Sequence, residues 1–333
     1  MPKDLNVTIL GAGSWGTTLA VHLDRKGCSV KLWEAFDDYA QILIETRVNE
    51  KYLPNTTIAP NIEITSVLEN VIPEADVIVV AIPTQYVRNV FTSVKEKFDS
   101  IKAMIVSVSK GIEVKSLKRI SEMTSEFYPD LDFVVLSGPS HAEEVSRRIP
   151  TSVVAASKNQ EAAKIVQELF MDDYFRVYTN KDVVGVELGG SLKNVIALAC
   201  GISDGLGFGD NSRAALITRG LAEMTRLAGA LGADRKTLSG LAGVGDLIVT
   251  CNSEHSRNRR VGRAIGEGKT LTDILTHMNM IAEGVETSKS VKRLGEKLGV
   301  EMPICEQVYQ VLFNHKDPHI AVRELMLRDP KEE

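Results

Sequence analysis

The sequence predicts an α/β fold in which a doubly wound sheet domain is followed by an all-helical domain. Short β-branched runs alternate with helical spacing through about the first 180 residues, as in a sheet with helices on both faces. Beyond about residue 182 the strand-like runs disappear, and helical spacing with many small residues takes over. We therefore predict two domains, residues 1–188 and residues 189–333, joined by a continuous helix.

Composition limits the classes of function. The formal net charge of −5 offers no general attraction to nucleic acid or to an anionic membrane, so an acidic ligand needs a local basic cluster. The four cysteines show no CxxC spacing, which indicates neither a disulfide framework nor a zinc site. No apolar run approaches the roughly 20 residues that span a bilayer, and the six residues before the first strand leave no room for a signal peptide. We expect a cytoplasmic protein without membrane insertion.

The first strand leads into a glycine-rich loop. Val7–Leu10 is a short buried strand, and helical spacing begins at Thr17. Between them, Gly11 allows a tight turn, Gly13 a close backbone approach to a pyrophosphate, and Gly16 close packing of helix on strand. The amides at the start of the helix would hold the phosphate charge. This arrangement predicts a Rossmann-like dinucleotide site.

The second strand ends in an acid. Ser29–Trp33 is followed by Glu34, 18 residues beyond Gly16, where a carboxylate can bind both ribose hydroxyls of an adenosine. Glu34 would also repel a 2′-phosphate, so we predict a preference for NAD(H), unless this side chain points away. NADP(H) stays possible because Arg47 or Lys51 could accommodate its extra phosphate.

The remaining elements of the first domain follow in order. Helical spacing runs to about Arg47, is broken at Lys51–Pro54, and resumes over 84–98. Further strands are expected at 62–65, 76–83, 103–109, 133–136, 151–156 and 175–178. Ligands of such sheets bind at the carboxyl ends of the strands. Those ends are the glycine loop, Glu34, Pro83, Lys110 and 137–140.

In the second domain, helical spacing covers 184–230 and 285–313, with glycine clusters at 205–209, 240–245 and 262–268. Lys193 and Asn194 are placed at the head of a buried helix. A lysine there can give or take the hydroxyl proton as a hydride moves. The alternative is a structural lysine whose ammonium reaches water.

Two further charged residues have two interpretations each. Lys110 could be a second catalytic cation at the sheet edge, or a solvated loop lysine. Asp246, after Gly243-Val-Gly, could orient the catalytic ammonium, or simply cap a helix.

The stretch Ser256-Arg-Asn-Arg-Arg260 opens a predicted helix. Arginine together with helix-terminal amides forms a good fork for phosphate or carboxylate, although a solvated basic face gives the same pattern. His315 and His319 are four apart, but Pro318 argues against a shared helical face, so we assign no metal. Residues 137–140 lack a GxSxG elbow, which leaves a serine hydrolase without support.

Taken together, these stretches resemble the NAD(P)-dependent glycerol-3-phosphate dehydrogenase family, in its bacterial type, almost from end to end. The matching motifs occur in order: Gly-Ala-Gly-Ser-Trp-Gly-Thr at 11–17, Ser-Lys-Gly-Ile-Glu at 109–113, Ser-Gly-Pro-Ser at 137–140, Glu-Leu-Gly-Gly-Ser-Leu-Lys-Asn at 187–194, Ala-Gly-Val-Gly-Asp-Leu at 242–247 and Ser-Arg-Asn-Arg at 256–259. Six motifs in one order are far more specific than any single one.

The resemblance implies a reaction and a set of roles. Dihydroxyacetone phosphate and reduced cofactor would interconvert with sn-glycerol 3-phosphate and oxidised cofactor, with Lys193 as the proton-transfer group. The implied substrate contacts are Lys110, Gly138, Ser140, Asp246, Ser256, Arg257 and Asn258. The implied cofactor contacts are Ser14, Trp15, Lys110, Ala142, Arg257, Ile281 and Glu283. A homodimer and a role in glycerophospholipid synthesis are implied by the family alone.

Two rival functions stay open at this stage. One is a hydroxyacid dehydrogenase of the same architecture, since such enzymes also place a lysine and an asparagine on a helix after the sheet domain. The other is a sensor that binds the dinucleotide without turnover, although a sensor has no need of a proton-transfer lysine.

Overall fold

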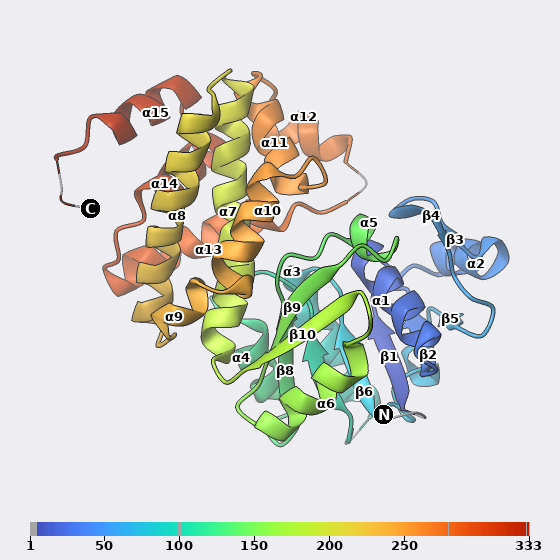
Figure 1. The fold of residues 1–333 in the computed structure, drawn as a ribbon. Helices are drawn as coiled ribbons and strands as arrows, with labels where there is room; N and C mark the ends of the chain where they lie inside the picture. Colours follow the sequence, from blue (N-terminus) through green and yellow to red (C-terminus); the bar gives the residue numbers. More distant parts are fainter. Residues whose placement is uncertain (1–4, 99–100, 279, 331, 333) are drawn as a thin grey trace. The chain divides into compact units, whose positions relative to one another are not determined.

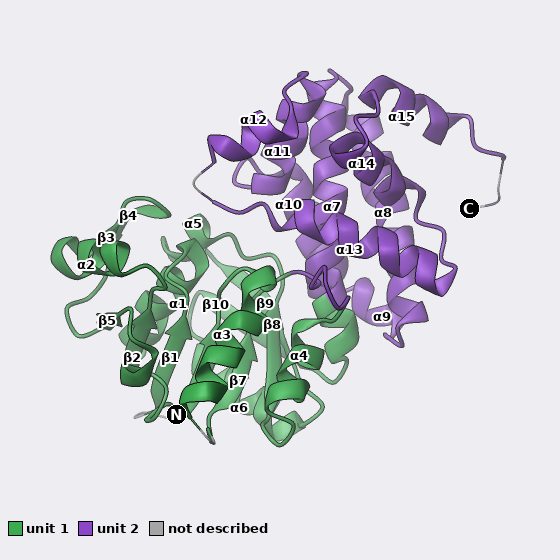
Figure 2. Cartoon of the chain, turned by 180° about the vertical axis from the view of Figure 1, so that it is seen from behind, with its two compact units in different colours: residues 1–110, 118–187 green, residues 111–117, 188–333 purple. Residues whose placement is uncertain are grey.

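The computed structural model describes residues 5–98, 101–278, 280–330 and 332. The chain forms two compact units, which Figure 2 colours separately. Unit 1 comprises residues 1–110 and 118–187, and unit 2 comprises residues 111–117 and 188–333. The segment 111–117 belongs to unit 2 through hydrogen bonds to its helices: the Ser290 hydroxyl donates to the Ile112 carbonyl at 2.9 Å, and Arg293 donates to the Val114 carbonyl.

Unit 1 is built on an eight-stranded sheet of order β10-β9-β8-β7-β6-β1-β2-β5. The strands are β1 (Asn6–Leu10), β2 (Ser29–Trp33), β5 (Glu63–Thr65), β6 (Val77–Val80), β7 (Met104–Ser107), β8 (Phe133–Ser137), β9 (Thr151–Ala156) and β10 (Phe175–Asn180). The pairs from β5 to β8 are parallel, which confirms the predicted doubly wound sheet.

The last two strands depart from this pattern. β9 is antiparallel to β8, and β10 is parallel to β9. The chain between β8 and β9 holds only the short helix α5 (Ala142–Val145), which is no crossover, so β9 starts from the end of the sheet where β8 stops.

Helices cover both faces of the sheet in Figure 1. One apolar core packs alternate strand residues such as Val77 and Val79 against α1 (Ser14–Arg25) and α6 (Gln160–Phe170). The other core packs the intervening Ile78 and Val80 against α3 (Thr84–Lys97) and α4 (Ile120–Phe127). α2 (Asp37–Thr46) contributes Leu43 to the first core. The alternation is the period of two expected of a strand buried on both faces.

One pair of strands went unpredicted. β3 (Val48–Asn49) and β4 (Leu53–Thr57) form a small antiparallel hairpin where the sequence indicated only a helix break. A three-residue 3-10 segment, η1 (Leu68–Asn70), lies between β5 and β6.

Within residues 188–333 of unit 2, the described elements are all helices, as predicted. Its elements are α7 (Val183–Gly205, which starts in unit 1), α8 (Asp210–Ala230), α9 (Arg235–Leu238), the π-helix η2 (Leu241–Gly245), α10 (Asp246–Asn252), α11 (Arg257–Gly266), α12 (Leu271–Thr276), α13 (Glu283–Leu298), α14 (Pro303–Phe313) and α15 (Pro318–Met326). The two long predicted helical stretches are each divided. α13 ends at Gly299, whose φ of +65° suits the left-handed end of a helix.

The long helix α7 corrects one expectation. It has 23 residues and is apolar enough to cross a bilayer by length and composition, whereas the sequence suggested no such run. In this structure 94% of its most apolar window is buried inside the protein. Two glycines allow a second helix to approach it closely: a Cβ on Gly201 would lie 2.1 Å from the Arg259 carbonyl, and one on Gly262 2.2 Å from the Leu198 carbonyl. α7 and α11 therefore touch backbone to backbone.

Candidate active site

The centre of unit 2 holds a buried lysine. Lys193 Nζ lies 2.5 Å from Asp246 Oδ1 and donates to Thr250 Oγ1 at 2.7 Å. The side chains of Lys193 and Asp246 are 8% and 1% exposed. The predicted alternative, a lysine reaching out to water, is therefore wrong. Asp246 is the first residue of α10, and its carboxylate binds the ammonium of another helix.

Glycines bring these two helices together. A Cβ on Gly189 would lie 2.3 Å from the Ala242 carbonyl, so α7 contacts the backbone of η2 directly. Lys193 stands one turn after Gly189 on the same face of α7. Asp246 follows η2 at once, which places its carboxylate beside the ammonium. Lys193 is in the middle of α7, not at its head as predicted, because the glycines at 189 and 190 continue the helix.

Thr250 was not among the site residues predicted from the sequence. Its hydroxyl lies 2.6 Å from the Asp246 carbonyl and 3.3 Å from Asp246 Oδ1, in addition to its contact with Lys193. The available signal was a threonine four residues after Asp246 in an otherwise apolar run, because that spacing puts both side chains on one helix face.

A second cluster in unit 2 surrounds the start of α11. The helix opens at this stretch, as predicted: Ser256 is its N-cap, and Ser256 Oγ accepts from the Arg259 amide at 3.3 Å. Asn258 is buried, and its Oδ1 accepts from the Gly284 amide at 2.9 Å, next to Glu283 at the start of α13. Arg257 Nη1 lies 3.4 Å from the Ile281 carbonyl. The predicted residues of 256–258, 281 and 283 thus come together.

This cluster adjoins the lysine. A Cβ on Gly284 would lie 2.6 Å from the Asn194 carbonyl and 2.8 Å from Asn258 Oδ1. Asn194 follows Lys193 directly in α7, so α7, α11 and α13 meet at this point. One region of unit 2 therefore carries both an ammonium and an arginine at a helix start.

In unit 1 the glycine loop has the geometry that a dinucleotide needs. Gly11 has a φ of +112°, and a Cβ on Gly16 would lie 1.9 Å from the Gly11 carbonyl, so neither position tolerates a side chain. A Cβ on Gly13, the N-cap of α1, would meet no atom within 4 Å. The loop therefore leaves open space in front of the first amides of α1, as a bound pyrophosphate requires.

Two other segments of unit 1 contact α1 next to this loop. The Thr18 hydroxyl donates to the Ser14 carbonyl at 2.8 Å and lies 3.4 Å from the Ala142 carbonyl, so α5 adjoins the first turn of α1. The Trp15 ring packs on Phe175, with centroids 6.4 Å apart.

Glu34 is buried at the carboxyl end of β2. Its Oε1 accepts from the Phe36 amide at 3.1 Å. Burial raises the pKa of this carboxyl, and hydrogen bonds from nearby amides, including that of Ala12, partly oppose the rise. The contact with Ala12 places the carboxylate against the glycine loop, so it does not point away.

Arg47 and Lys51, the two basic residues considered for a 2′-phosphate, make different contacts. Arg47 Nη1 donates to the Ile62 carbonyl at 2.8 Å, within unit 1. The Lys51 ammonium lies over the rings of Tyr52 and Tyr39, at 5.0 and 5.4 Å from their centroids. Its positive charge also lowers the pKa of Glu34.

Three more of the predicted site residues follow the carboxyl ends of β7 and β8. Lys110 Nζ donates to the Gly138 carbonyl at 3.0 Å, and the Ser140 hydroxyl donates to the same oxygen at 2.9 Å. Gly138 has a φ of +145°, and a Cβ there would lie 3.0 Å from Val153 Cα. All three residues belong to unit 1. The two histidines are separate, as predicted: α15 begins at Pro318, and His315 precedes it.

Two family models match this chain, one in each part of the sequence. Residues 6–163 match the family model described as NAD-dependent glycerol-3-phosphate dehydrogenase N-terminus, and residues 182–323 match its C-terminus counterpart. The chain is 54% identical over 330 residues to a glycerol-3-phosphate dehydrogenase [NAD(P)+] of Prosthecochloris aestuarii, covering 98% of this chain and 99% of the relative. A Thermoanaerobacter protein of the same name is 52% identical and covers 99% of each chain.

Solved structures give the same result. The crystal structure of glycerol-3-phosphate dehydrogenase from Coxiella burnetii matches with a TM-score of 0.95 at 40% identity, covering 98% of this chain and 100% of that one. The chain belongs to the NAD-dependent glycerol-3-phosphate dehydrogenase family.

Proposed function

We propose that this protein interconverts dihydroxyacetone phosphate and sn-glycerol 3-phosphate, with Lys193 as the group that transfers the hydroxyl proton. The observation that carries the proposal is the buried Lys193–Asp246 pair, 2.5 Å apart, in the same unit as the arginine and amides at the start of α11. When bound, the nicotinamide cofactor supplies or accepts the hydride.

The ammonium of Lys193 does the acid–base work. During ketone reduction it donates a proton from Nζ to the oxygen of the substrate's middle carbon, and during alcohol oxidation Nζ takes that proton back. Asp246 and Thr250 hold Nζ from two directions, at 2.5 and 2.7 Å, so the remaining N–H directions of the ammonium are set. Asp246 thus positions the proton donor.

The other end of the substrate needs a phosphate site. Arg257, Asn258 and the amides at the start of α11 provide a positive fork at the end of a ten-residue helix. Ser256 caps that helix, and we assign it to the same site. Lys110, Gly138 and Ser140 at the sheet edge are proposed as further substrate contacts, in agreement with their shared hydrogen bonds.

Residues of unit 1 would hold the cofactor. The loop around Gly11, Gly13 and Gly16 leaves space for the pyrophosphate, and Ser14, Trp15 and Ala142 stand beside it. The Glu34 carboxylate would bind the two ribose hydroxyls and repel a 2′-phosphate, so we propose that NAD(H) is preferred. Lys51, close to Glu34, is the residue through which NADP(H) would be admitted. Arg257, Ile281 and Glu283 are proposed as cofactor contacts from unit 2.

Three features of the cellular role are proposed on the family resemblance. The protein would act in the cytoplasm, as a homodimer, and would supply glycerol 3-phosphate for phospholipid synthesis. The four cysteines fit a reducing compartment, because all four are buried free thiols.

The test is reduction of dihydroxyacetone phosphate, followed as loss of NADH absorbance and, separately, of NADPH absorbance. We expect rapid oxidation of NADH and slow oxidation of NADPH. Equal rates would keep the reaction and overturn the role of Glu34. If neither cofactor is oxidised, the proposed substrate is wrong, and the assay should be repeated with small 2-keto and 3-keto acids.

A further inference from the structure

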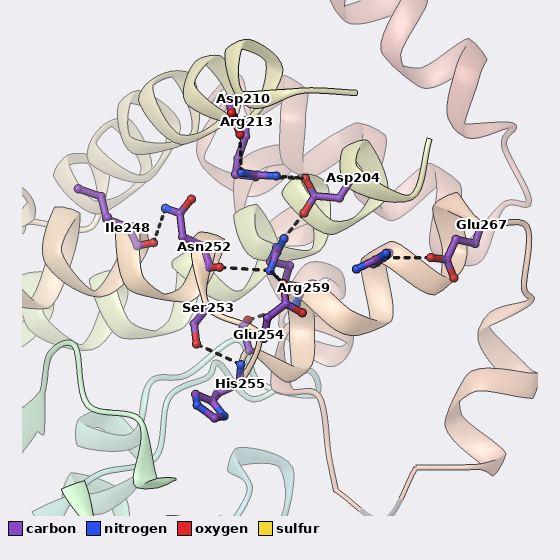
Figure 3. A network of polar contacts seen from close by, with 12 residues as sticks. Asp204, Asp210, Arg213, Ile248, Asn252, Ser253, Glu254, His255, Arg259 and Glu267 are labelled. Atoms are coloured by element: carbon purple, nitrogen blue, oxygen red, sulfur yellow. Dashed lines mark hydrogen bonds and ion pairs between the residues drawn. The ribbon is translucent and has the colours of Figure 1, made fainter. Parts of the chain in front are cut away.

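Three segments of unit 2 meet at the side chain of Arg259, as Figure 3 shows. Its Nε donates to Asp204 Oδ2 at 2.7 Å, near the end of α7. Its Nη1 donates to Glu254 Oε1 at 2.6 Å and to the carbonyl of Asn252, the last residue of α10, at 3.2 Å. Arg259 is only 8% exposed, and the side chain of Asp204 is also 8% exposed, so the contact between these two is formed largely away from water, where it is strong.

The segment that Arg259 holds connects the two parts of the proposed site. Residues 253–256 join α10, which begins with Asp246, to α11, which begins with Arg257. The Arg259 amide also donates to the hydroxyl of Ser256, the N-cap of α11. Arg259 therefore engages this connection at its start, in its middle and at its end.

The backbone of Arg259 is itself fixed against α7. A Cβ on Gly201 would lie 2.1 Å from the Arg259 carbonyl, so the two backbones are in direct contact. Lys193 lies two turns earlier on α7. The backbone contact between Gly201 and Arg259 and the hydrogen bonds of the Arg259 side chain therefore fix the start of α11 relative to the Lys193 ammonium.

We infer that Arg259 is a positioning residue for the proposed phosphate site: through Asp204, Glu254 and Asn252 it holds Ser256–Asn258 in place relative to Lys193 and Asp246. This inference rests on the proposed function. Arg259 need not touch the substrate. Its three acceptors lie in different directions, which suits the planar fork of a guanidinium, whereas a lysine would satisfy one or two of them.

The experiment compares Arg259→Lys with Arg213→Lys. Arg213 donates to the other oxygen of the same aspartate, Asp204 Oδ1, at 2.7 Å, and it also donates to Asp210, which likewise lies outside residues 252–256. The control therefore makes the same chemical change on the same carboxylate. For Arg259→Lys we expect KM for dihydroxyacetone phosphate to rise about tenfold or more, because small displacements of binding groups are costly. For Arg213→Lys we expect the wild-type KM.

Two further readouts separate positioning from general damage. Turnover of dihydroxyacetone, which lacks the phosphate, should be equal in Arg259→Lys and the wild type. Glu254→Gln removes the exposed anchor of the connection, whose side chain is 73% exposed, so this variant should fold even if the buried substitution does not. We expect a smaller rise in KM, about threefold, with kcat unchanged.

The inference is overturned if Glu254→Gln keeps the wild-type KM. It is equally overturned if Arg259→Lys loses activity to the same degree on both ketones, or if Arg213→Lys behaves identically. A wild-type enzyme that does not reduce dihydroxyacetone phosphate would instead overturn the proposed function, and that assay comes first.

Discussion

Lys193 and Asp246, 53 positions apart in the chain, form a buried pair with Nζ and Oδ1 at 2.5 Å. A buried charge without its partner is costly, by about 3–5 kcal/mol when one member of a pair is removed. Replacing either member should therefore change stability as well as the proposed catalytic role, and experiments on the pair need to separate the two.

Replacing Lys193 tests its proposed role in proton transfer. Lys193→Ala should lower kcat by about 10²–10⁴-fold, the usual worth of a positioned acid or base, while Kd for NADH, measured by fluorescence titration, stays near the wild-type value. It should also lower Tm, since Asp246 loses its partner.

The double variant Lys193→Ala/Asp246→Ala supplies the control. It removes both buried charges, so its Tm should recover relative to Lys193→Ala while its activity stays low. Recovered activity, or retained turnover in the single variant, would remove Lys193 from the mechanism.

Glu34 is the basis for the expected preference for NAD(H). Glu34→Gln removes the negative charge beside the glycine loop, so KM for NADPH should fall about tenfold, in line with the worth of one charge-assisted contact. KM for NADH should change only a few-fold. Glu63→Gln, on the edge strand β5 of the same sheet, serves as the control because its side chain is 50% exposed. An unchanged NADPH KM in Glu34→Gln would show that the carboxylate does not discriminate.

The contact between α7 and α11 should be intolerant of a methyl group. Gly262→Ala would put Cβ 2.2 Å from the Leu198 carbonyl, which forces the backbones apart. We expect a loss of about 3 kcal/mol in the free energy of unfolding, measured by urea denaturation. Gly229→Ala is the matched control: it lies inside α8, its nearest neighbour is a flexible arginine side chain at 3.7 Å, and it should stabilise by about 0.5–1 kcal/mol. Equal effects of both substitutions would contradict the close contact.

The buried carboxyl of Glu223 should make the free energy of unfolding depend on pH. Its carboxylate accepts from the amides of Ile304 and Cys305 at 2.7 and 3.2 Å, yet burial raises its pKa above the ordinary value of 4.5. Between the unfolded and folded pKa values the native state binds more protons than the unfolded state, so the Glu223 contribution falls as pH rises through this window. Glu223→Gln cannot titrate. Its free energy of unfolding relative to the wild type should therefore increase from about pH 4.5 upward, and a flat difference across that range would contradict the raised pKa.

The cysteines should be unreactive in the native protein. Burial raises the pKa of the thiols of Cys28 and Cys305, and that of Cys251 is raised chiefly by its contact with Cys200. Because the thiolate is the reactive form, Ellman's reagent at pH 8 should label no thiol within minutes, and should label four after denaturation in guanidinium chloride. Rapid labelling of the native protein would show that one of these sites opens.

Local sequence patterns predicted most of the fold. The strand around Ile9, the glycines of the first loop and the acid at the end of β2 were predictable because period, chirality and turn geometry act over a few neighbouring residues. Lys193, Asp246 and the start of α11 were recognisable for a similar reason: each is a polar residue in an apolar or glycine-rich run.

Other features depended on packing. Of the predicted glycine clusters, 205–209 separates α7 from α8, whereas Gly262 lies inside α11. Gly262, together with Gly189 and Gly201 inside α7, lets helix backbones meet. The antiparallel direction of β9 follows from the short connection before it, which the spacing of apolar residues does not reveal.

The sequence by itself determined the eight strands of the main sheet, the helical character of the second unit, and which residue types are available for binding a dinucleotide and moving a proton. Only the tertiary structure decided that the ammonium of Lys193 binds Asp246 and Thr250 rather than water, that Glu34 faces the glycine loop, and that Arg259 holds the start of α11. The physical reason is the same in each case. The partner of a side chain depends on which distant segments pack against it, and local sequence patterns do not predict that packing.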